Sequence, residues 1–211
     1  MVNRANGLTR QSILSEIKQR GSVTTDELGE DLGISSVAVR QHLSTLAAEG
    51  RVSITIERRG LGRPVHRYHL TPEGDEEFDR SYDDLCIQLL DSVRDTQGND
   101  GVDAIMGSRR KKLTAGLMPR VTGVPLETRV REIARFQDGF GYMASSKAED
   151  GSVKLTEYNC AICKVAKEFP NLCNHEMEMF QELAGTDVSV VRESHILSGD
   201  IACVYRFTPK A

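Results

Sequence analysis

Four cysteines near the end of the chain are the residues best suited to carry chemistry. Three of them fall within 14 residues and the fourth follows 30 positions later, in the series C-x2-C-x9-C-x29-C: Cys160, Cys163, Cys173 and Cys203. Four thiolates can complete a tetrahedral zinc site or the outer ligation of an iron–sulfur cluster. The spacing does not distinguish these two, so it predicts a metal site of either kind at the four cysteines.

The elements predicted around these cysteines are helices and strands in mixed order. A helix over 160–169 would place Cys160 and Cys163 on one face. Pro170 breaks that helix, and Cys173 opens the next one. Strands with alternating apolar residues are predicted nearby, at 142–146, 153–158, 187–194 and 200–207, and the last of these contains Cys203. The C-terminal part is therefore expected to be an α+β domain.

The fifth cysteine, Cys86, falls on a predicted apolar helix, where we expect it only to pack. An odd number of cysteines does not suggest a disulfide framework. The start of the chain lacks the apolar core of a secretory signal, and no stretch is long and apolar enough to cross a membrane. We therefore expect a cytoplasmic protein with reduced thiols.

Side chains able to read DNA bases lie on the outer face of a predicted helix over about 36–48. Its inner face is apolar, and its outer face carries polar side chains. Arg40 and Gln41 can each make paired hydrogen bonds to a base edge, whereas serine hydroxyls suit phosphates and shorter contacts. The predicted DNA contacts of this helix are Ser35, Ser36, Arg40, Gln41 and Ser44.

A winged helix-turn-helix needs two helices before this one and a hairpin after it. Thr24 and Glu27 have the spacing of a capping box at the start of the second helix. After the third helix, an alternating strand and a return strand over 65–70 flank a turn rich in glycine and arginine. We expect Arg63 to enter the minor groove from this wing, with Arg58 and Arg59 on the adjacent phosphates.

The distribution of charge supports this assignment, although the formal net charge of −4 by itself argues against a nucleic-acid-binding protein. Residues 1–70 hold ten Lys and Arg against seven Asp and Glu, and the rest of the chain holds seventeen against twenty-four. A basic first part and an acidic second part indicate one DNA-facing domain and one domain with another role.

A helical segment is predicted between the two domains. Its apolar residues repeat at the spacing of paired helices: Phe78, Tyr82, Leu85, Leu89 and Val93. We expect the helix around 73–95 to pair two chains, with a loop over 96–101 after it. The predicted domains are a winged helix-turn-helix at 1–71, a helical dimerisation region at 72–122 and an α+β sensor domain at 123–211.

The sequence resembles known repressors over nearly its whole length. Residues 33–43, Gly-Ile-Ser-Ser-Val-Ala-Val-Arg-Gln-His-Leu, are similar to the recognition helix of ArsR/DeoR-like winged-helix repressors. Residues 60–64 and 68–71 resemble the wing of a narrower group, the Suf-operon repressors, which sense iron–sulfur clusters. The C-terminal pattern resembles the same group at Glu157 to Cys160, Phe169-Pro170, Cys173, Glu176, Phe180, Gly199 and Cys203 to Tyr205.

This resemblance implies a homodimer that represses iron–sulfur assembly genes from a palindromic, double-stranded operator while its cluster is bound. The implied cofactor is an iron–sulfur cluster, [4Fe–4S] in preference to [2Fe–2S]. It implies Cys160, Cys173 and Cys203 as ligands, whereas the family more often has another residue at 163. Cys163 is our predicted fourth ligand, and His175 and Glu176 are the alternatives.

Two other functions are compatible with parts of the sequence. A zinc- or thiol-based sensor would use the same DNA-binding domain. An enzyme or electron carrier with an added DNA-binding module would need further motifs, and neither a nucleotide-binding glycine loop nor an HExxH motif is present. We therefore expect a protein that is not an enzyme and takes no small-molecule substrate.

Overall fold

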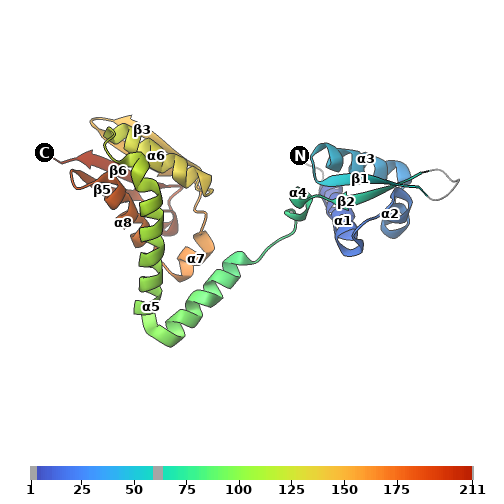
Figure 1. Cartoon of the computed structure of the whole chain (residues 1–211), viewed down its shortest axis with the longest axis horizontal. Helices are drawn as coiled ribbons and strands as arrows, with labels where there is room; N and C mark the ends of the chain where they lie inside the picture. The colour runs from blue at the N-terminus through green and yellow to red at the C-terminus, as the bar shows by residue number, and fades with distance from the viewer. Residues whose placement is uncertain (1–3, 59–63, 211) are drawn as a thin grey trace. The chain divides into compact units, whose positions relative to one another are not determined.

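The computed structural model describes the backbone of residues 4–58 and 64–210, and side chains within these ranges from residue 9 onward. The chain divides into two compact units, Met1–Arg80 and Ser81–Ala211 (Figure 1). The first unit contains α1 (Arg4–Arg20), α2 (Thr25–Leu32), α3 (Ser36–Ala48), β1 (Val52–Glu57), β2 (Val65–Leu70) and α4 (Pro72–Asp75). Three helices followed by a hairpin is the order that the sequence predicts.

Local sequence explains where α2 and α3 begin. The Thr24 hydroxyl accepts a hydrogen bond from the Glu27 N–H (3.2 Å), and the Glu27 carboxylate accepts one from the Thr24 N–H (2.7 Å). The predicted capping box is therefore confirmed. Gly33 ends α2 with φ of +63°, a left-handed conformation that glycine adopts without steric cost. The Ser35 hydroxyl then caps α3 by accepting a backbone N–H of its first turn (3.2 Å).

One apolar core holds the first unit together. Its buried members come from the three helices and the hairpin: Ile13, Leu14, Ile17, Val23, Leu28, Val39, Leu43, Leu46, Val52 and Tyr68. Val23 and Tyr68 also exchange two backbone hydrogen bonds of 3.1 and 2.8 Å, which tie the chain between α1 and α2 to the hairpin. Because α3 turns its apolar side to this core, its polar side is left outward.

β1 and β2 pair antiparallel, from Val52 opposite Leu70 to Glu57 opposite Val65. This register confirms the predicted hairpin as far as the described residues extend. The tip of the wing, including the predicted contacts Arg59 and Arg63, lies outside them.

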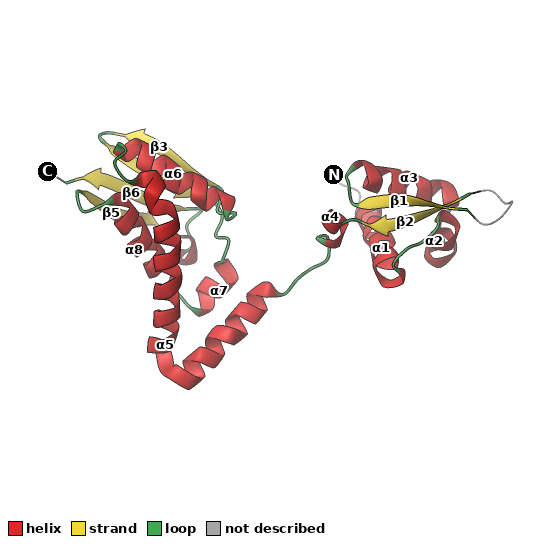
Figure 2. Ribbon diagram, in the orientation of Figure 1, coloured by secondary structure: helices red, strands yellow, loops and turns green. Residues whose placement is uncertain are grey.

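The second unit places helices on one face of a four-stranded antiparallel sheet (Figure 2). Its elements are α5 (Tyr82–Val121), α6 (Leu126–Gly139), β3 (Ala144–Glu149), β4 (Ser152–Glu157), α7 (Cys163–Glu168), α8 (Leu172–Ala184), β5 (Val188–Ser194) and β6 (Cys203–Pro209). The strands lie in the order β3-β4-β6-β5. α6 packs on β3 and β4, α8 packs on β5, and α5 lies against both helices. This is the expected mixture of helices and strands, and no described helix is long and apolar enough to cross a membrane.

α5 consists of two helical segments that meet at a kink at Gly98. The helix is therefore interrupted inside the predicted loop over 96–101, but the predicted extent of the loop is wrong. Only Gly98 departs from helical geometry, with φ of +71° and ψ of −172°. Glycine tolerates this conformation, which accounts for a kink confined to one residue. The sequence signal of Gly, Asn and Asp in this segment therefore marks an interruption of the helix at one residue and not a longer loop.

The apolar series predicted to pair two helices, here called the seam, is divided among three environments. It consists of Phe78, Tyr82, Leu85, Leu89 and Val93. α4 ends at Asp75 and α5 begins at Tyr82, so no continuous helix spans 73–95. Phe78 packs against the core of the first unit, and Val93 packs in a cluster between α5 and α7. The other three seam residues are exposed: Tyr82 by 65%, Leu85 by 52% and Leu89 by 59%. These three residues are the exposed members of the seam.

Two strand boundaries also differ from the prediction. β3 covers 144–149 instead of 142–146, because Tyr142 is buried and Met143 adopts a left-handed φ of +50° that does not belong in a strand. β6 covers 203–209 instead of 200–207, so Cys203 is its first residue.

Leu43→Ala is expected to destabilise the first unit by about 2–5 kcal/mol, because it leaves a cavity at a fully buried position. Ser44→Ala, at an exposed position of the same helix, should change the free energy of unfolding by less than about 0.5 kcal/mol. Denaturant unfolding followed by circular dichroism measures both variants. Similar losses in the two would contradict the assignment of the inner and outer faces of α3.

Candidate DNA-reading surface and cysteine centre

The outer face of α3 presents the predicted base-reading residues to solvent. Arg40, Gln41 and Ser44 are exposed, and Ser36 is half-buried. Among the described residues, Arg40 has no hydrogen-bond or ion-pair partner, so its guanidinium is free to bind a base edge. Ser35 is exposed as well, but its oxygen already accepts the capping hydrogen bond of α3. Its hydroxyl proton can still be donated to a phosphate.

The arginines of the hairpin fall into two groups. Arg58, which follows β1, is exposed, as a phosphate contact requires. Arg67, on β2, donates to the Glu57 carboxylate (2.7 Å) and to the Ser22 hydroxyl (3.3 Å). The guanidinium of Arg67 is therefore committed within the first unit.

The four clustered cysteines come from three segments of the second unit. Cys160 lies in a turn, where its carbonyl accepts the Cys163 N–H (3.1 Å), and Cys163 is the first residue of α7. Cys173 is the second residue of α8, and Cys203 is the first residue of β6. The predicted helix over 160–169 is therefore wrong at its start. Cys160 and Cys163 are brought together by a turn and not by a shared helix face.

These thiols share one partly enclosed neighbourhood. Cys173 and Cys203 are buried, and Cys160 and Cys163 are half-buried. Burial raises the pKa of Cys160 to about 12, and the negative charges of Cys163 and Cys173 add to the effect. Burial likewise raises the pKa of Cys173 to about 11, with contributions from Cys203 and Cys163. Without a compensating positive charge, the thiols of Cys160 and Cys173 stay protonated at neutral pH.

Some of the surroundings favour a thiolate. Cys173 lies in the first turn of α8, at the positive end of the helix dipole. The positive charge of Arg192 lowers the pKa of Cys173, and its guanidinium donates to the Cys173 carbonyl (3.3 Å). The Ile196 N–H donates to the sulfur of Cys203 (3.4 Å).

Two carboxyl groups lie beside the cysteines and share one amide. The Gln137 side-chain amide donates to Glu157 Oε1 (2.8 Å) and to Glu176 Oε1 (3.2 Å), and the Tyr205 hydroxyl donates to Glu176 Oε2 (2.9 Å). Burial raises the pKa of Glu157 to about 9, and the charge of Glu176 adds to this. Burial also raises the pKa of Glu176. The pair therefore holds at least one proton at neutral pH.

Sequence reasoning found Glu176 as a possible ligand but missed Gln137 and the buried role of Glu157. The signal for Glu157 is its strand register. Val153 and Leu155 alternate with polar residues along β4, and Glu157 continues the same inward-facing series. An acid at such a position must be neutral or hydrogen-bonded, which indicates a polar site inside the domain.

No three His, Cys, Asp or Glu side chains converge on a single-ion position within the part of the chain that the structure describes. A cluster of several irons binds each thiolate at a different iron, so its ligands need not meet at one point.

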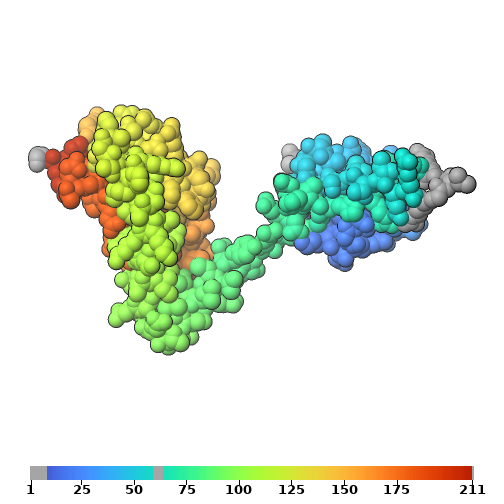
Figure 3. Space-filling model, in the orientation of Figure 1, coloured from blue at the N-terminus to red at the C-terminus, as the bar shows by residue number. Residues whose placement is uncertain are grey.

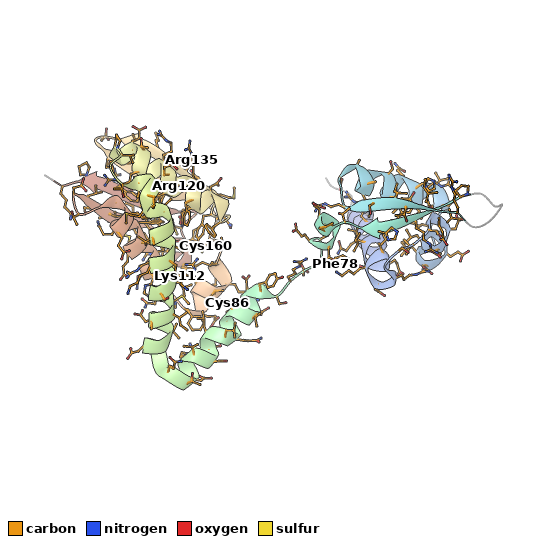
Figure 4. The ribbon with its side chains drawn as sticks, viewed as in Figure 1. Phe78, Cys86, Lys112, Arg120, Arg135 and Cys160 are labelled. Carbon is orange, nitrogen blue, oxygen red and sulfur yellow. The ribbon has the colours of Figure 1, made fainter. Side chains whose placement is uncertain are left out.

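Cys86 is exposed, so the expectation that it only packs is wrong. It lies on the first half of α5 (Figure 4), and α7 covers only the side of that helix that carries Ile87 and Leu90. Cys86 is far along the chain from the other cysteines, so a substitution there is a suitable control for substitutions of the four clustered cysteines.

Comparison with known proteins identifies the first unit. Residues 9–61 match the family model described as "HTH domain". A 66-residue segment is 33% identical to the Bacillus subtilis (strain 168) protein named probable C4-dicarboxylate response regulator DctR. This segment is 31% of the present chain, and the chain spans only 29% of the length of that relative.

Among solved structures, the crystal structure of Bacillus subtilis PadR in complex with operator DNA aligns over 84% of this chain and 97% of that chain. The identity is 13% and the TM-score is 0.31, values that do not establish a shared fold. The domain match therefore carries the identification: residues 9–61 form a helix-turn-helix domain. The molecule joins this domain to an α+β unit with four neighbouring cysteines.

Glu157→Gln is expected to make stability less dependent on pH. The folded protein holds the Glu157 proton up to about pH 9, whereas an unfolded carboxyl releases it near its ordinary pKa of 4.5. The free energy of unfolding therefore falls as pH rises between these values, and glutamine removes this contribution.

Denaturant unfolding of the metal-free protein between pH 5 and pH 9 measures this slope. Glu168→Gln, at an exposed position of α7, is the matched control and should keep the wild-type slope. If Glu157→Gln and Glu168→Gln unfold with the same pH dependence as wild type, Glu157 does not hold a buried proton.

Proposed function

We propose that this protein is a homodimeric transcriptional repressor that binds operator DNA and senses an iron–sulfur cluster held by its C-terminal cysteines. Its target genes, from the sequence resemblance, are those of iron–sulfur assembly. The observation that carries the proposal is the joining, in one chain, of a helix-turn-helix domain to four thiols in a single neighbourhood.

The DNA-binding part of the proposal is supported by the match of residues 9–61 and by the outer face of α3. In a helix-turn-helix, the second helix of the motif enters the major groove. α3 occupies that place, with Arg40 and Gln41 exposed and suited to paired hydrogen bonds. Arg58 is exposed beside it to bind phosphate.

The sensing part is supported by the chemistry of the donor set. Cys160, Cys173 and Cys203 come from a turn, a helix start and a strand start, so a shared ligand would tie three segments together. Cys163 is the proposed fourth ligand. A bound cluster supplies positive charge from iron, which is what these desolvated thiols need in order to ionise. Loss of the ligand would leave the three segments held only by hydrogen bonds and packing.

The dimer is supported by the exposed stripe of α5, defined as Tyr82, Leu85 and Leu89. We propose that a second copy of the chain covers this stripe, because a palindromic operator needs two DNA-binding domains related by symmetry. Two acidic residues of the same segment already have counter-charges: Asp84 pairs with Lys164, and Asp91 pairs with Arg94.

By linkage, DNA binding and cluster binding must affect each other equally. If the cluster-bound form represses, operator DNA must stabilise cluster binding by the same factor. The DNA-reading and sensing roles are thus one proposal with two measurable parts.

Arg40→Ala is expected to lose about 1–3 kcal/mol of binding to an operator selected from a library of random duplexes, because it removes a bidentate base contact. Base preference should relax at one position of the selected site. Fluorescence anisotropy with the selected operator and with its single-base variants measures both effects. An equal loss on unselected DNA would contradict the base-reading role.

Cys160→Ser, Cys173→Ser and Cys203→Ser are each expected to lose the cluster after anaerobic reconstitution with iron and sulfide. Cys86→Ser is the matched control and should keep it, because that exposed residue lies on a separate face. Visible absorption, together with iron, acid-labile sulfide and zinc assays, measures the outcome. A colourless wild-type protein containing zinc would support a zinc sensor and contradict the proposed cofactor.

A further inference from the structure

Helices α5 and α6 carry a concentration of positive charge that the proposed function does not use. Residues 109–135 hold eight Lys and Arg against two Asp and Glu, in a chain whose net charge is −4. Six of these cations are exposed on two packed helices. Lys111 faces α8, and the other five are Arg109, Lys112 and Arg120 of α5, and Arg131 and Arg135 of α6. We call these five residues the basic strip.

The members on α5 share one side of that helix. Lys112 is three residues after Arg109 and Arg120 is eleven residues after it. At 3.6 residues per turn, these separations place all three side chains within a sector of about 80°. The opposite side of the helix is buried in the domain core. Figure 3 shows the surfaces of α5 and α6 side by side, and Figure 4 shows Lys112, Arg120 and Arg135 along them.

Much of the basic strip has no counter-charge in the described residues. Lys112 and Arg120 make no hydrogen bond or ion pair there. Arg135 pairs with Glu132 (2.5 Å) while its side chain stays 67% exposed. The two other arginines of this region have internal roles: Arg110 pairs with Glu178 and Glu182, and Arg129 donates to backbone carbonyls.

The length of the basic strip suits a repeating anion. Arg109 and Arg120 are eleven residues apart, which is about 16 Å along a helix. One strand of duplex DNA carries a phosphate about every 3.4 Å of axis, so this length covers about five phosphates. Exposed cations at several points along such a length, with Lys112 and Arg120 making no ion pair among the described residues, match a phosphate backbone better than they match one small anion.

We propose that the basic strip binds the phosphate backbone of double-stranded DNA as a second, sequence-independent contact. This proposal rests on the proposed DNA-binding function of the first unit. Both units belong to one chain, so DNA held by α3 is present at high effective concentration for the strip. The acidic second part of the chain then contributes to DNA affinity through these two helices.

The test is the salt dependence of DNA binding by the full-length protein. Lys112→Ala/Arg120→Ala should lower the slope of log K against log salt by about 2 in magnitude for each protomer on the duplex, since each lost phosphate contact contributes about 0.9. The loss should be the same on a long random-sequence duplex and on the selected operator, and base preference should be unchanged. Anisotropy titrations over a range of salt concentrations measure these slopes.

Lys111→Ala is the matched control, because Lys111 is exposed on the same helix but lies about 100° away from Lys112 and faces α8. It removes one positive charge, where the double variant removes two, and it should keep the wild-type slope. A wild-type slope in the double variant overturns the proposal, as does an equal loss in Lys111→Ala. Loss of binding to an acidic polyglutamate peptide with no change in the DNA slope would assign the strip to an acidic protein partner and also overturn it.

Failure of the strip is distinguishable from failure of the proposed function. If the first unit does not read DNA, the wild-type protein shows no preference for any selected duplex. If only the strip is wrongly assigned, that preference persists and the double variant binds with the wild-type slope.

Discussion

The cost of burying charge governs the second unit. Four thiols and two carboxyl groups lie close together, and burial raises the pKa of Cys160, Cys173, Glu157 and Glu176. The one side-chain amide of Gln137 serves both carboxyls, so they cannot both ionise cheaply. Such an interior is stable with its protons in place, or with a cation that replaces them. This property makes the site suited to report whether a metal group is bound.

A contact within the second unit links that site to α5. Leu90 and Val93 of α5 pack with Val165 and Phe169, which belong to α7 and to the residue just after it. α7 begins at Cys163. If the cysteine segments became less ordered, the surface of α7 that packs against the first arm of α5, the part before Gly98, would change with them. The same arm carries the exposed stripe proposed to pair two copies. The proposed signal therefore has a short physical path, within the second unit, from the cysteines to the stripe proposed to pair two copies.

The helix-turn-helix was predictable because its signals are local. The capping box at Thr24, the cap at Ser35 and the apolar face of α3 each depend on residues within a few positions of one another, and the structure has all three. The helix around 73–95 was not predictable in the same way. Its apolar residues have helical spacing, but Phe78 packs against the core of the first unit and Val93 packs against α7. Periodicity shows that residues share a face and not which partner covers it.

The sequence by itself determined the presence of the hairpin, the mixed second unit and the clustered cysteines, because alternation, caps and residue type are written in short stretches of chain. Only the tertiary structure decided that a turn joins Cys160 to Cys163 and that the helix interruption is confined to Gly98. The tertiary structure alone showed that Glu157 and Glu176, beside the thiols, accept hydrogen bonds from the same side-chain amide, that of Gln137. These features arise where segments distant in sequence compete for the same buried space, and the energy of desolvation settles that competition.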